Sequence, residues 1–157
     1  MVGVLRGKDA GMKVNIGCGT KKEPGWIGID CRPEVKPDIL RDLRRGLPFA
    51  DNTVDEIRCN QVLEHLASDD LMFVLEEMIR VCRPGAHITI SVPHVNSMGA
   101  WSDPTHVRCF HERQFKMLAS ASYFGDRIHI VELRVDRWRA EGDTEDRANI
   151  ICIYEAR

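Results

Sequence analysis

The chain has 157 residues, of which 43% are hydrophobic and 29% charged, and its formal net charge is −2. This length and composition are typical of one folded domain and exclude disordered and fibrous classes. No stretch approaches the ~20 apolar residues of a membrane helix, and the near-neutral charge argues against a binder of nucleic acid. The six cysteines stand singly, so we expect reduced thiols in a cytoplasmic protein.

Short apolar runs between glycine, proline and polar residues predict strands throughout the chain after a loosely held arm at residues 1–12. The predicted strands cover residues 13–16, 26–29, 38–40, 54–59, 87–92, 127–135 and 149–154. Apolar residues at spacings of three and four between Ser68 and Cys82 predict a helix, and Phe110 to Ser122 predicts another. A solvated loop is expected at residues 137–147. Strands mixed with helices, without a polar break, predict a single α/β domain over residues 1–157.

Glycine or polar residues follow five successive predicted strands. They are Gly17-Cys18-Gly19, Asp30, Asp42, Asn60 and His94. In an open parallel sheet the carboxyl ends of the strands share one edge, where the ligand crevice forms. The glycines allow close approach of the backbone to a ligand, but Lys22 stands where a dinucleotide-binding motif has its third glycine. Asp30 can accept hydrogen bonds from ribose hydroxyls and Asp42 from an exocyclic amine such as that of adenine; otherwise, each is a solvated strand-end residue.

Several motifs together resemble the class I S-adenosylmethionine-dependent methyltransferases. They are Val14 to Thr20, Gly28-Ile29-Asp30, Asp42 with Leu47-Pro48-Phe49, Val54-Asp55-Glu56-Ile57, Val62-Leu63-Glu64-His65-Leu66 and Val81 to Gly85. The resemblance covers residues 13–93. It implies a three-layer-like, Rossmann-type sheet of seven strands with a C-terminal antiparallel hairpin, and S-adenosylmethionine as cofactor.

The same resemblance implies which residues surround the cofactor. Gly17, Cys18 and Gly19 would pass under its methionine part, Asp30 would bind the ribose, Asp42 and Leu43 would surround the adenine, and Asn60 and Gln61 would lie beside the sulfonium. Cys31 and His65 complete the predicted cofactor set.

Two connections are shorter than the family pattern requires. Residues 20–25 and 32–38 join the first three strands, whereas a parallel crossover usually needs about a dozen residues or more. Six extended residues span roughly 20 Å, enough to return past a strand of about 16 Å, so we expect straps in place of the early crossover helices. We place apolar side chains on both faces of the sheet there, and therefore expect a homodimer or a partner subunit over the uncovered face. These side chains are Val14, Ile16, Ile27, Ile29 and Ile39.

The segment from Pro93 to His111 follows the fifth predicted strand and is rich in histidine. Short methyltransferase-like proteins carry a run similar to Asp103-Pro104-Thr105-His106 at this place. Methyl transfer depends on alignment and desolvation, and an oxygen or nitrogen nucleophile also needs a base, for which the near-neutral pKa of histidine is suited. The candidate catalytic residues are His106, His94, Asp103 and His111. A lone histidine is otherwise a hydrogen-bonded structural residue.

The main prediction is a methyltransferase acting on an oxygen or nitrogen of a small molecule, because Asn60-Gln61-Val62-Leu63 lacks the Asn/Asp-Pro-Pro-aromatic run of DNA amino-methylating enzymes. One alternative is a catalytically inactive subunit that binds S-adenosylmethionine or regulates a partner. Another is a zinc-binding module, in which His106-x-x-Cys109-x-His111 would act with His94 or Asp103, although this spacing matches no closed zinc module.

Overall fold

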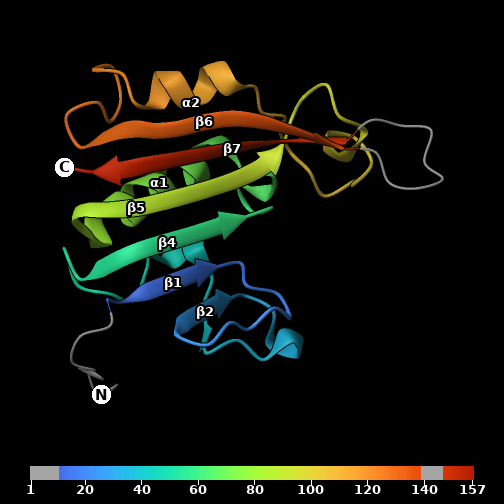
Figure 1. Cartoon of the computed structure of the whole chain (residues 1–157). Helices are drawn as coiled ribbons and strands as arrows, with labels where there is room; N and C mark the ends of the chain where they lie inside the picture. The colour runs from blue at the N-terminus through green and yellow to red at the C-terminus, as the bar shows by residue number, and fades with distance from the viewer. Residues whose placement is uncertain (1–10, 139–146) are drawn as a thin grey trace.

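Seven strands form one mixed sheet in this computed structural model, which describes residues 11–138 and 147–157 (Figure 1). The strands are β1 (Lys13–Ile16), β2 (Trp26–Asp30), β3 (Ile39–Leu40), β4 (Val54–Asn60), β5 (Cys82–Pro93), β6 (Ile128–Trp138) and β7 (Arg147–Ala156). Their order in the sheet is β3-β2-β1-β4-β5-β7-β6. The pairs from β3 to β5 are parallel, whereas β7 is antiparallel to both β5 and β6. The predicted α/β sheet with a C-terminal antiparallel hairpin is confirmed.

Element boundaries differ from the prediction in the second half of the chain. Helix α1 (Ser68–Val81) passes directly into β5 at Cys82, five residues earlier than predicted, because the register between β4 and β5 shifts and accommodates residues 83–86 as an irregularity. Helix α2 (Glu112–Leu118) is shorter than predicted: His111 caps its start by accepting a hydrogen bond from the Arg113 amide, and Ala119 ends it. Residues 1–10 of the predicted arm and 139–146 of the predicted loop lie outside the described residues.

The early crossovers are straps, as predicted. Between β1 and β3 the chain forms no α-helix; it runs through short turns and the single 3₁₀ turn η1 (Pro33–Val35). The first strap is fastened to the sheet by Glu23, which accepts hydrogen bonds from Arg58 at 2.7 and 2.8 Å. The Arg58 guanidinium also lies 4.2 Å from the ring centroid of Trp26. Ion pairing and stacking therefore replace the helix contacts that usually hold this part of such a sheet.

Both α-helices cover the same face of the sheet. Side chains of α1 and α2 meet those of β5, β6 and β7 around one small internal space, which is lined by Leu75, Met78, Ile79, Ile88, Ile90, Leu118, Phe124, Ile128 and Tyr154. In Figure 1, which looks onto the other face, α1 lies behind β4 and β5. The second helical layer of the predicted three-layer arrangement is thus reduced to the two straps.

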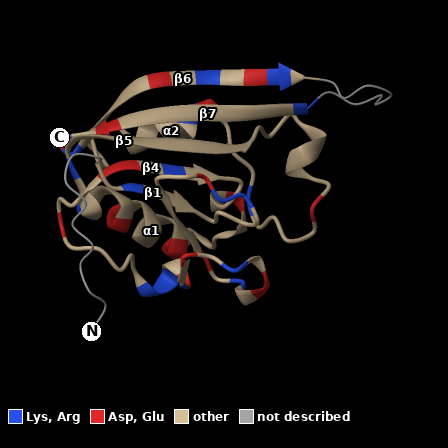
Figure 2. Ribbon diagram, turned by 60° about the horizontal axis from the view of Figure 1, so that its bottom comes forward, with Lys and Arg blue, Asp and Glu red and all other residues tan. Residues whose placement is uncertain are grey.

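The face without helices is polar. One row of register partners crosses five strands in the order Lys13, Glu56, His87, Glu155, His129. Within it, Lys13 pairs with Glu56 at 2.7 Å, and Glu155 pairs with His87 at 3.4 Å and with His129 at 3.6 Å. Figure 2 shows acidic and basic residues alternating along β6 as well. Water can therefore cover this face without the cost of exposing a large apolar patch.

The prediction that apolar side chains of the first three strands lie on both faces is wrong. Val14 pairs in register with Ile27, Ile16 with Ile29, and Ile29 with Ile39, so the five side chains share one face. Side chains alternate along a strand, and the intervening positions point to the open face. Val14, Ile16 and Ile29 are fully buried in the common core. The physical argument for a homodimer over a bare apolar face no longer holds.

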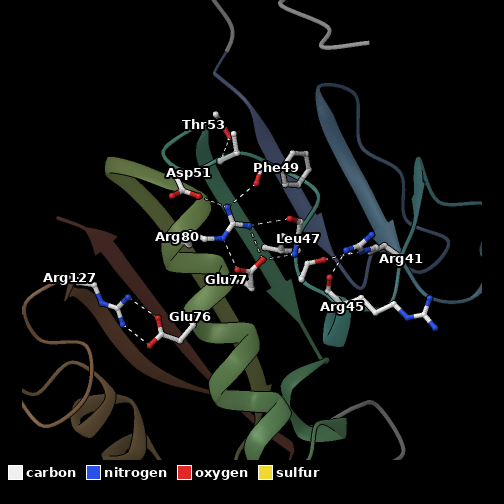
Figure 3. Close-up of polar contacts among 12 residues, drawn as sticks. Arg41, Arg45, Leu47, Phe49, Asp51, Thr53, Glu76, Glu77, Arg80 and Arg127 are labelled. Atoms are coloured by element: carbon white, nitrogen blue, oxygen red, sulfur yellow. Dashed lines mark hydrogen bonds and ion pairs between the residues drawn. The ribbon is translucent and has the colours of Figure 1, made fainter. Parts of the chain in front are cut away.

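One arginine of α1 fixes the loop that follows β3 (Figure 3). Arg80 donates to both carboxylate oxygens of Glu77 at 2.6 and 2.8 Å, to Asp51 at 2.6 Å, and to the carbonyls of Phe49 and Leu47 at 3.0 and 3.2 Å. Glu77 in turn accepts from the Leu47 amide at 2.8 Å. Hydrogen bonds from Arg80 hold the pKa of Glu77 below its usual value, despite partial burial. This network anchors residues 47–53 and, through them, the preceding corner of the candidate site.

All six cysteines are free thiols, and Cys18, Cys59, Cys82 and Cys152 are buried. Burial raises the pKa of Cys82 and Cys152 to about 12, so these thiols stay protonated at neutral pH. Among the described residues, no helix is long and apolar enough to cross a membrane.

Candidate functional site

The carboxyl ends of β1 to β4 surround a cavity of about 660 Å³, hereafter the first cavity. It is lined by Gly17, Asp30, Cys31, Arg32, Arg41, Asp42, Leu43, Arg44, Gln61, Val62, His65, Leu66, Asp70, Asp103 and Thr105. This is the edge of the sheet at which the sequence predicted the ligand crevice. Its volume lies within the usual range for small-molecule sites.

The glycine loop after β1 forms one wall of the first cavity. Gly17 has φ +63°, and a Cβ atom there would lie 2.2 Å from Cγ2 of Val62, so no larger residue fits without displacing the wall. The Cys18 amide donates to the Ile29 carbonyl at 3.1 Å, and the Gly19 amide donates to Oδ2 of Asp30 at 2.9 Å. Strand β2 therefore supports the loop directly, in the place of a following helix.

Asp30 at the end of β2 is buried, and its carboxylate is fully engaged. Besides Gly19, it accepts from the Arg32 amide at 3.0 Å and from the Arg32 guanidinium at 3.2 and 3.3 Å. Burial alone would raise the pKa of Asp30, but the hydrogen bonds from Arg32 and Gly19 outweigh it and hold the pKa below its usual value. A carboxylate offers about four lone-pair positions, so a ligand hydroxyl must replace the Arg32 side chain. That side chain is 56% exposed and can move away.

Asp42 and Leu43 form the corner after β3. Asp42 caps the 3₁₀ turn η2 (Leu43–Arg45) by accepting from the Arg44 amide at 3.0 Å, and it pairs with the Arg44 guanidinium at 2.7 Å. The hydrogen bonds from Arg44 hold the pKa of Asp42 below its usual value. Leu43 and Leu66 add apolar surface to the same cavity. A flat, mostly apolar ring with a polar edge fits such a corner.

A second cavity of about 520 Å³ adjoins the first, because Gln61, His65 and Asp103 line both. Its other lining residues are Glu64, Gly99, Ser102, Pro104 and His106. Gln61 lies at the junction with φ +55°, and its amide donates to the Ser91 carbonyl at 2.8 Å. Positive φ is uncommon outside glycine and is often found at functional sites, so Gln61 is held in place by the surrounding structure.

His106 presents a free nitrogen to the second cavity. Its Nδ1 lies 3.1 Å from the Ala100 carbonyl, which can only accept, so in the neutral imidazole Nδ1 carries the proton and Nε2 keeps its lone pair. Nε2 lies 3.9 Å from Oδ2 of Asp103 and 4.0 Å from Oε1 of Glu64. Hydrogen bonds from Thr105 hold the pKa of Asp103 below its usual value, so this carboxylate is ionised beside the imidazole.

Glu64 is a site residue that the sequence analysis missed. It lies in the 3₁₀ turn η3 (Leu63–His65), its side chain is 1% exposed, and neither carboxylate oxygen has a hydrogen-bond partner among the described residues. Burial raises the pKa of Glu64. The available signal was a glutamate inside the apolar run Val62-Leu63-Glu64-His65-Leu66, since a charged residue between apolar neighbours is rarely buried without a function.

His94 and His111 do not line either cavity. His94 is buried, with Nε2 3.1 Å from Glu112 and with Nδ1 accepting from the Asn96 amide at 3.0 Å. His111 caps α2. Both histidines therefore fasten the start of α2 and line neither cavity.

The zinc set suggested by spacing is not assembled. Among the described residues, the groups whose ligand atoms lie close together are Glu64 with His65 and His106, and His94 with His111 and Glu112. His106 and His111 fall in different groups, and Cys109 falls in neither. The interpretation of His106-x-x-Cys109-x-His111 as a metal site is therefore wrong.

The structure brings most of the predicted cofactor residues together. Those lining the first cavity are Gly17, Asp30, Cys31, Asp42, Leu43, Gln61 and His65. Cys18, Gly19 and Asn60 do not line it. Cys18 and Gly19 instead hold the loop against β2. Arg32, Arg41 and Arg44 also line the cavity, although they were not predicted.

Comparison with known protein families finds that residues 31–90 match the model of a methyltransferase domain. Comparison with curated proteins by sequence finds no match. Among solved structures, a SAM-dependent methyltransferase from Archaeoglobus fulgidus is similar, with a TM-score of 0.70 and 16% identity, over 94% of this chain and 87% of that one.

Two further solved structures show the range of proteins with this fold. The N-methyltransferase NodS from Bradyrhizobium japonicum WM9, in complex with S-adenosyl-L-homocysteine, has a TM-score of 0.67 and 15% identity, over 93% of this chain and 78% of that one. A 16S rRNA adenine N1-methyltransferase variant from Catenulisporales acidiphilia has a TM-score of 0.63 and 12% identity, over 92% and 84%.

Proposed function

We propose that this chain is a class I S-adenosylmethionine-dependent methyltransferase that methylates an oxygen or nitrogen atom of a small molecule bound in the second cavity; the match of residues 31–90 to a methyltransferase domain and the fold support this. The observation that carries the proposal is the junction of the two cavities at Gln61, His65 and Asp103. A cofactor in the first cavity would present its sulfonium to an acceptor in the second through this junction.

The residues of the first cavity fit S-adenosylmethionine part by part. The Gly17 backbone would lie against its methionine part, and Asp30 would accept from the ribose hydroxyls after the Arg32 side chain has moved away. Leu43 would pack on the adenine, and Asp42 would accept from its amine. When bound, S-adenosylmethionine supplies an electrophilic methyl group. The chain supplies the alignment and the exclusion of water that an in-line displacement needs.

His106 is the proposed proton acceptor in the second cavity. The acceptor atom uses a lone pair to form a bond to the methyl carbon while the carbon–sulfur bond breaks, and sulfur keeps the electron pair of that bond. The proton of the acceptor passes to Nε2 of His106, whose lone pair the Ala100 carbonyl keeps available by holding Nδ1 protonated. The ionised Asp103 stabilises the imidazolium that results.

The size and charge of the second cavity support a small acceptor. A volume of about 520 Å³ holds a metabolite-sized molecule, and two carboxylates, Glu64 and Asp103, line it. Acidic walls disfavour a polyanionic nucleic acid. NodS, a structural neighbour, is an N-methyltransferase. The cytoplasmic location remains a prediction, and the proposal includes no homodimer because the open face of the sheet is polar.

Calorimetric titration with S-adenosyl-L-homocysteine tests the cofactor part of the proposal. Asp30→Asn should weaken binding by about 1–3 kcal/mol, since ligand hydroxyls lose a charged hydrogen-bond acceptor. Asp136→Asn is the matched control, because Asp136 lies on β6 and lines neither cavity. Absence of binding to the wild-type chain would refute the proposal, and equal affinities of the two variants would remove Asp30 from the site.

A product assay against a panel of small hydroxyl and amine compounds tests the transfer itself. His106→Gln should lower kcat by about 100-fold or more while leaving the affinity for S-adenosyl-L-homocysteine unchanged. Tight binding of S-adenosyl-L-homocysteine without turnover of any compound would instead favour the inactive, cofactor-binding subunit.

A further inference from the structure

Three side chains that line the second cavity, Glu64, His65 and His106, present atoms that can accept hydrogen bonds. Both carboxylate oxygens of Glu64 are buried and lack a hydrogen-bond partner among the described residues. One ligand atom from each of Glu64, His65 and His106 lies within 4.8 Å of the others. A buried carboxylate without a donor is costly, so such a group indicates an absent cation or donor.

The hydrogen bonds around His65 leave its Nε2 atom as an acceptor too. The Thr105 hydroxyl donates its only proton to Asp103 at 2.6 Å, so it cannot also donate to Nδ1 of His65, 3.0 Å away. Nδ1 of His65 must therefore donate, to that hydroxyl or to the Thr105 carbonyl at 3.3 Å. His106 has the same arrangement, with Nδ1 held by the Ala100 carbonyl. Both imidazoles keep a lone pair on Nε2.

We propose that Glu64, His65 and His106 bind a divalent transition-metal ion of the zinc type in the second cavity, with the Asp103 carboxylate beside the site but not among its ligands. Two imidazoles and one carboxylate, with one position open to a cavity, form a known kind of catalytic zinc or iron site. A backbone carbonyl or similar group on the other ring nitrogen is the usual support of a histidine ligand. An organic ammonium group is the other cation that this acceptor-lined pocket would hold, but two oriented imidazoles favour a transition metal.

The distances allow this with a small adjustment. Ligand atoms at about 2.0–2.2 Å from a zinc ion lie roughly 3–3.5 Å from one another. Nε2 of His106 is 4.0 Å from Oε1 of Glu64 and 3.9 Å from Oδ2 of Asp103. The three ligand atoms of Glu64, His65 and His106 lie within 4.8 Å of one another, so closure by up to about 1.5 Å, which side-chain rotation provides, would bring them to bonding positions.

The second group of possible ligands, His94, His111 and Glu112, carries no such inference. Nδ1 of His94 already accepts from the Asn96 amide, so its Nε2 holds the proton and donates to Glu112. Nδ1 of His111 accepts from the Arg113 amide. In this group hydrogen bonds occupy both nitrogens of His94 and Nδ1 of His111. In the group around Glu64 they leave both carboxylate oxygens and Nε2 of each neutral imidazole without a hydrogen-bond partner in the described part of the chain.

The role of the ion rests on the proposed function, although its binding does not. An acceptor hydroxyl coordinated through its oxygen would lose its proton more readily, and the half-exposed Asp103 would pass that proton to water. When the ion is bound, Nε2 of His106 is a ligand and cannot accept the proton of the acceptor. The cation then promotes loss of that proton in place of His106. The site would then favour acceptors that carry a hydroxyl or carboxylate oxygen.

Titration of the chelator-treated full chain with Zn²⁺ tests the proposal directly. The wild type should bind one ion, while Glu64→Gln and His106→Gln should each weaken binding by about 100-fold or more. His87→Gln is the control, since His87 is an exposed histidine on the open face and should leave the affinity unchanged. Mg²⁺ should not compete, because imidazole ligands disfavour it.

Co²⁺ provides a spectroscopic check on the ligands. Its visible absorption should lack a thiolate charge-transfer band, which would otherwise indicate binding at Cys31 or Cys109, the cysteines that are not buried. Unchanged Zn²⁺ affinity in Glu64→Gln, or a thiolate band, overturns the proposal. Binding of S-adenosyl-L-homocysteine is measured on the same samples: if it fails while Zn²⁺ binds, the proposed function falls and the metal site stands; if it persists while Zn²⁺ does not bind, only the metal site falls.

Discussion

Two neighbouring glutamates of α1 give a controlled comparison of buried and exposed ion pairs. Glu76 and Glu77 each form a two-pronged pair with an arginine, Arg127 and Arg80 respectively (Figure 3). The side chains of Glu76 and Arg127 are 49% and 44% exposed, whereas that of Glu77 is 14% exposed. We expect Arg80→Met to destabilise the fold far more than Arg127→Met.

The expected magnitude follows from what each substitution leaves behind. Arg80→Met removes every charged donor from Glu77, which keeps only the Leu47 amide, and it removes the donors to two loop carbonyls. Breaking a largely buried pair and leaving one partner costs about 2–4 kcal/mol. The exposed pair of Glu76 and Arg127 contributes at most about 1 kcal/mol.

Urea denaturation at pH 7, monitored by circular dichroism, measures the loss of unfolding free energy in each variant. Because Arg80 holds the folded-state pKa of Glu77 below its unfolded value, the pair stabilises the fold above pH ~4.3 and this stabilisation is lost as the pH falls through the folded-state pKa. The difference between the two variants should therefore shrink in acid. Equal losses of unfolding free energy at pH 7 would refute the reasoning from burial.

Three further substitutions have defined outcomes. Glu64→Gln should stabilise the chelator-treated protein at pH 7 but not below pH ~4. Burial raises the pKa of Glu64 in the folded protein, so ionisation of its carboxyl lowers the free energy of unfolding as the pH rises. A pH-independent effect in thermal unfolding would contradict this. Gly17→Ala should lower the free energy of unfolding by about 1–3 kcal/mol and weaken binding of S-adenosyl-L-homocysteine, because φ is +63° and the new Cβ would overlap Val62. Wild-type affinity in calorimetry would argue against a close approach of the ligand to Gly17. Tyr154→Phe should cost about 1–2 kcal/mol in urea denaturation, since the buried hydroxyl donates to the Phe115 carbonyl at 2.8 Å, and no loss would mean that the carbonyl finds another donor.

The fold was predictable because its signals are local. Runs such as Lys13 to Ile16 and Val54 to Cys59 intersperse apolar with polar residues and are bounded by glycine or polar residues, and each forms a strand at that place. The straps followed from counting residues between strands. The start of β5 was not predictable, since Arg83-Pro84-Gly85 marks a helix end but carries no sign that the chain enters the sheet at once.

The faces of the early strands were assigned wrongly because the relative register of β1, β2 and β3 is a property of the assembled sheet. The site residues at strand ends were predictable because the carboxyl ends of parallel strands lie at one edge of the sheet, which is where the first cavity forms. The separation of His106 from His111 was not predictable, because it depends on how residues 94–111 fold back over η3, where the Val107 amide donates to the Glu64 carbonyl at 2.9 Å. The partners of Glu64 depend on the same fold, although its place in an apolar run was visible in the sequence.

The straps have a consequence for the motions of the free protein. β2 and β3 lie at one edge of the sheet and carry no helix of their own, and neither residue of β3 is buried, so few buried contacts oppose the opening of this edge. Regions with few buried contacts exchange their amide hydrogens through local unfolding at low free energy. We expect the amides of β2 and β3 to exchange well before those of β4 and β5. Residues at the ends of these strands line the first cavity. A bound cofactor would therefore slow their amide exchange and stabilise the part of the sheet that has no crossover helices.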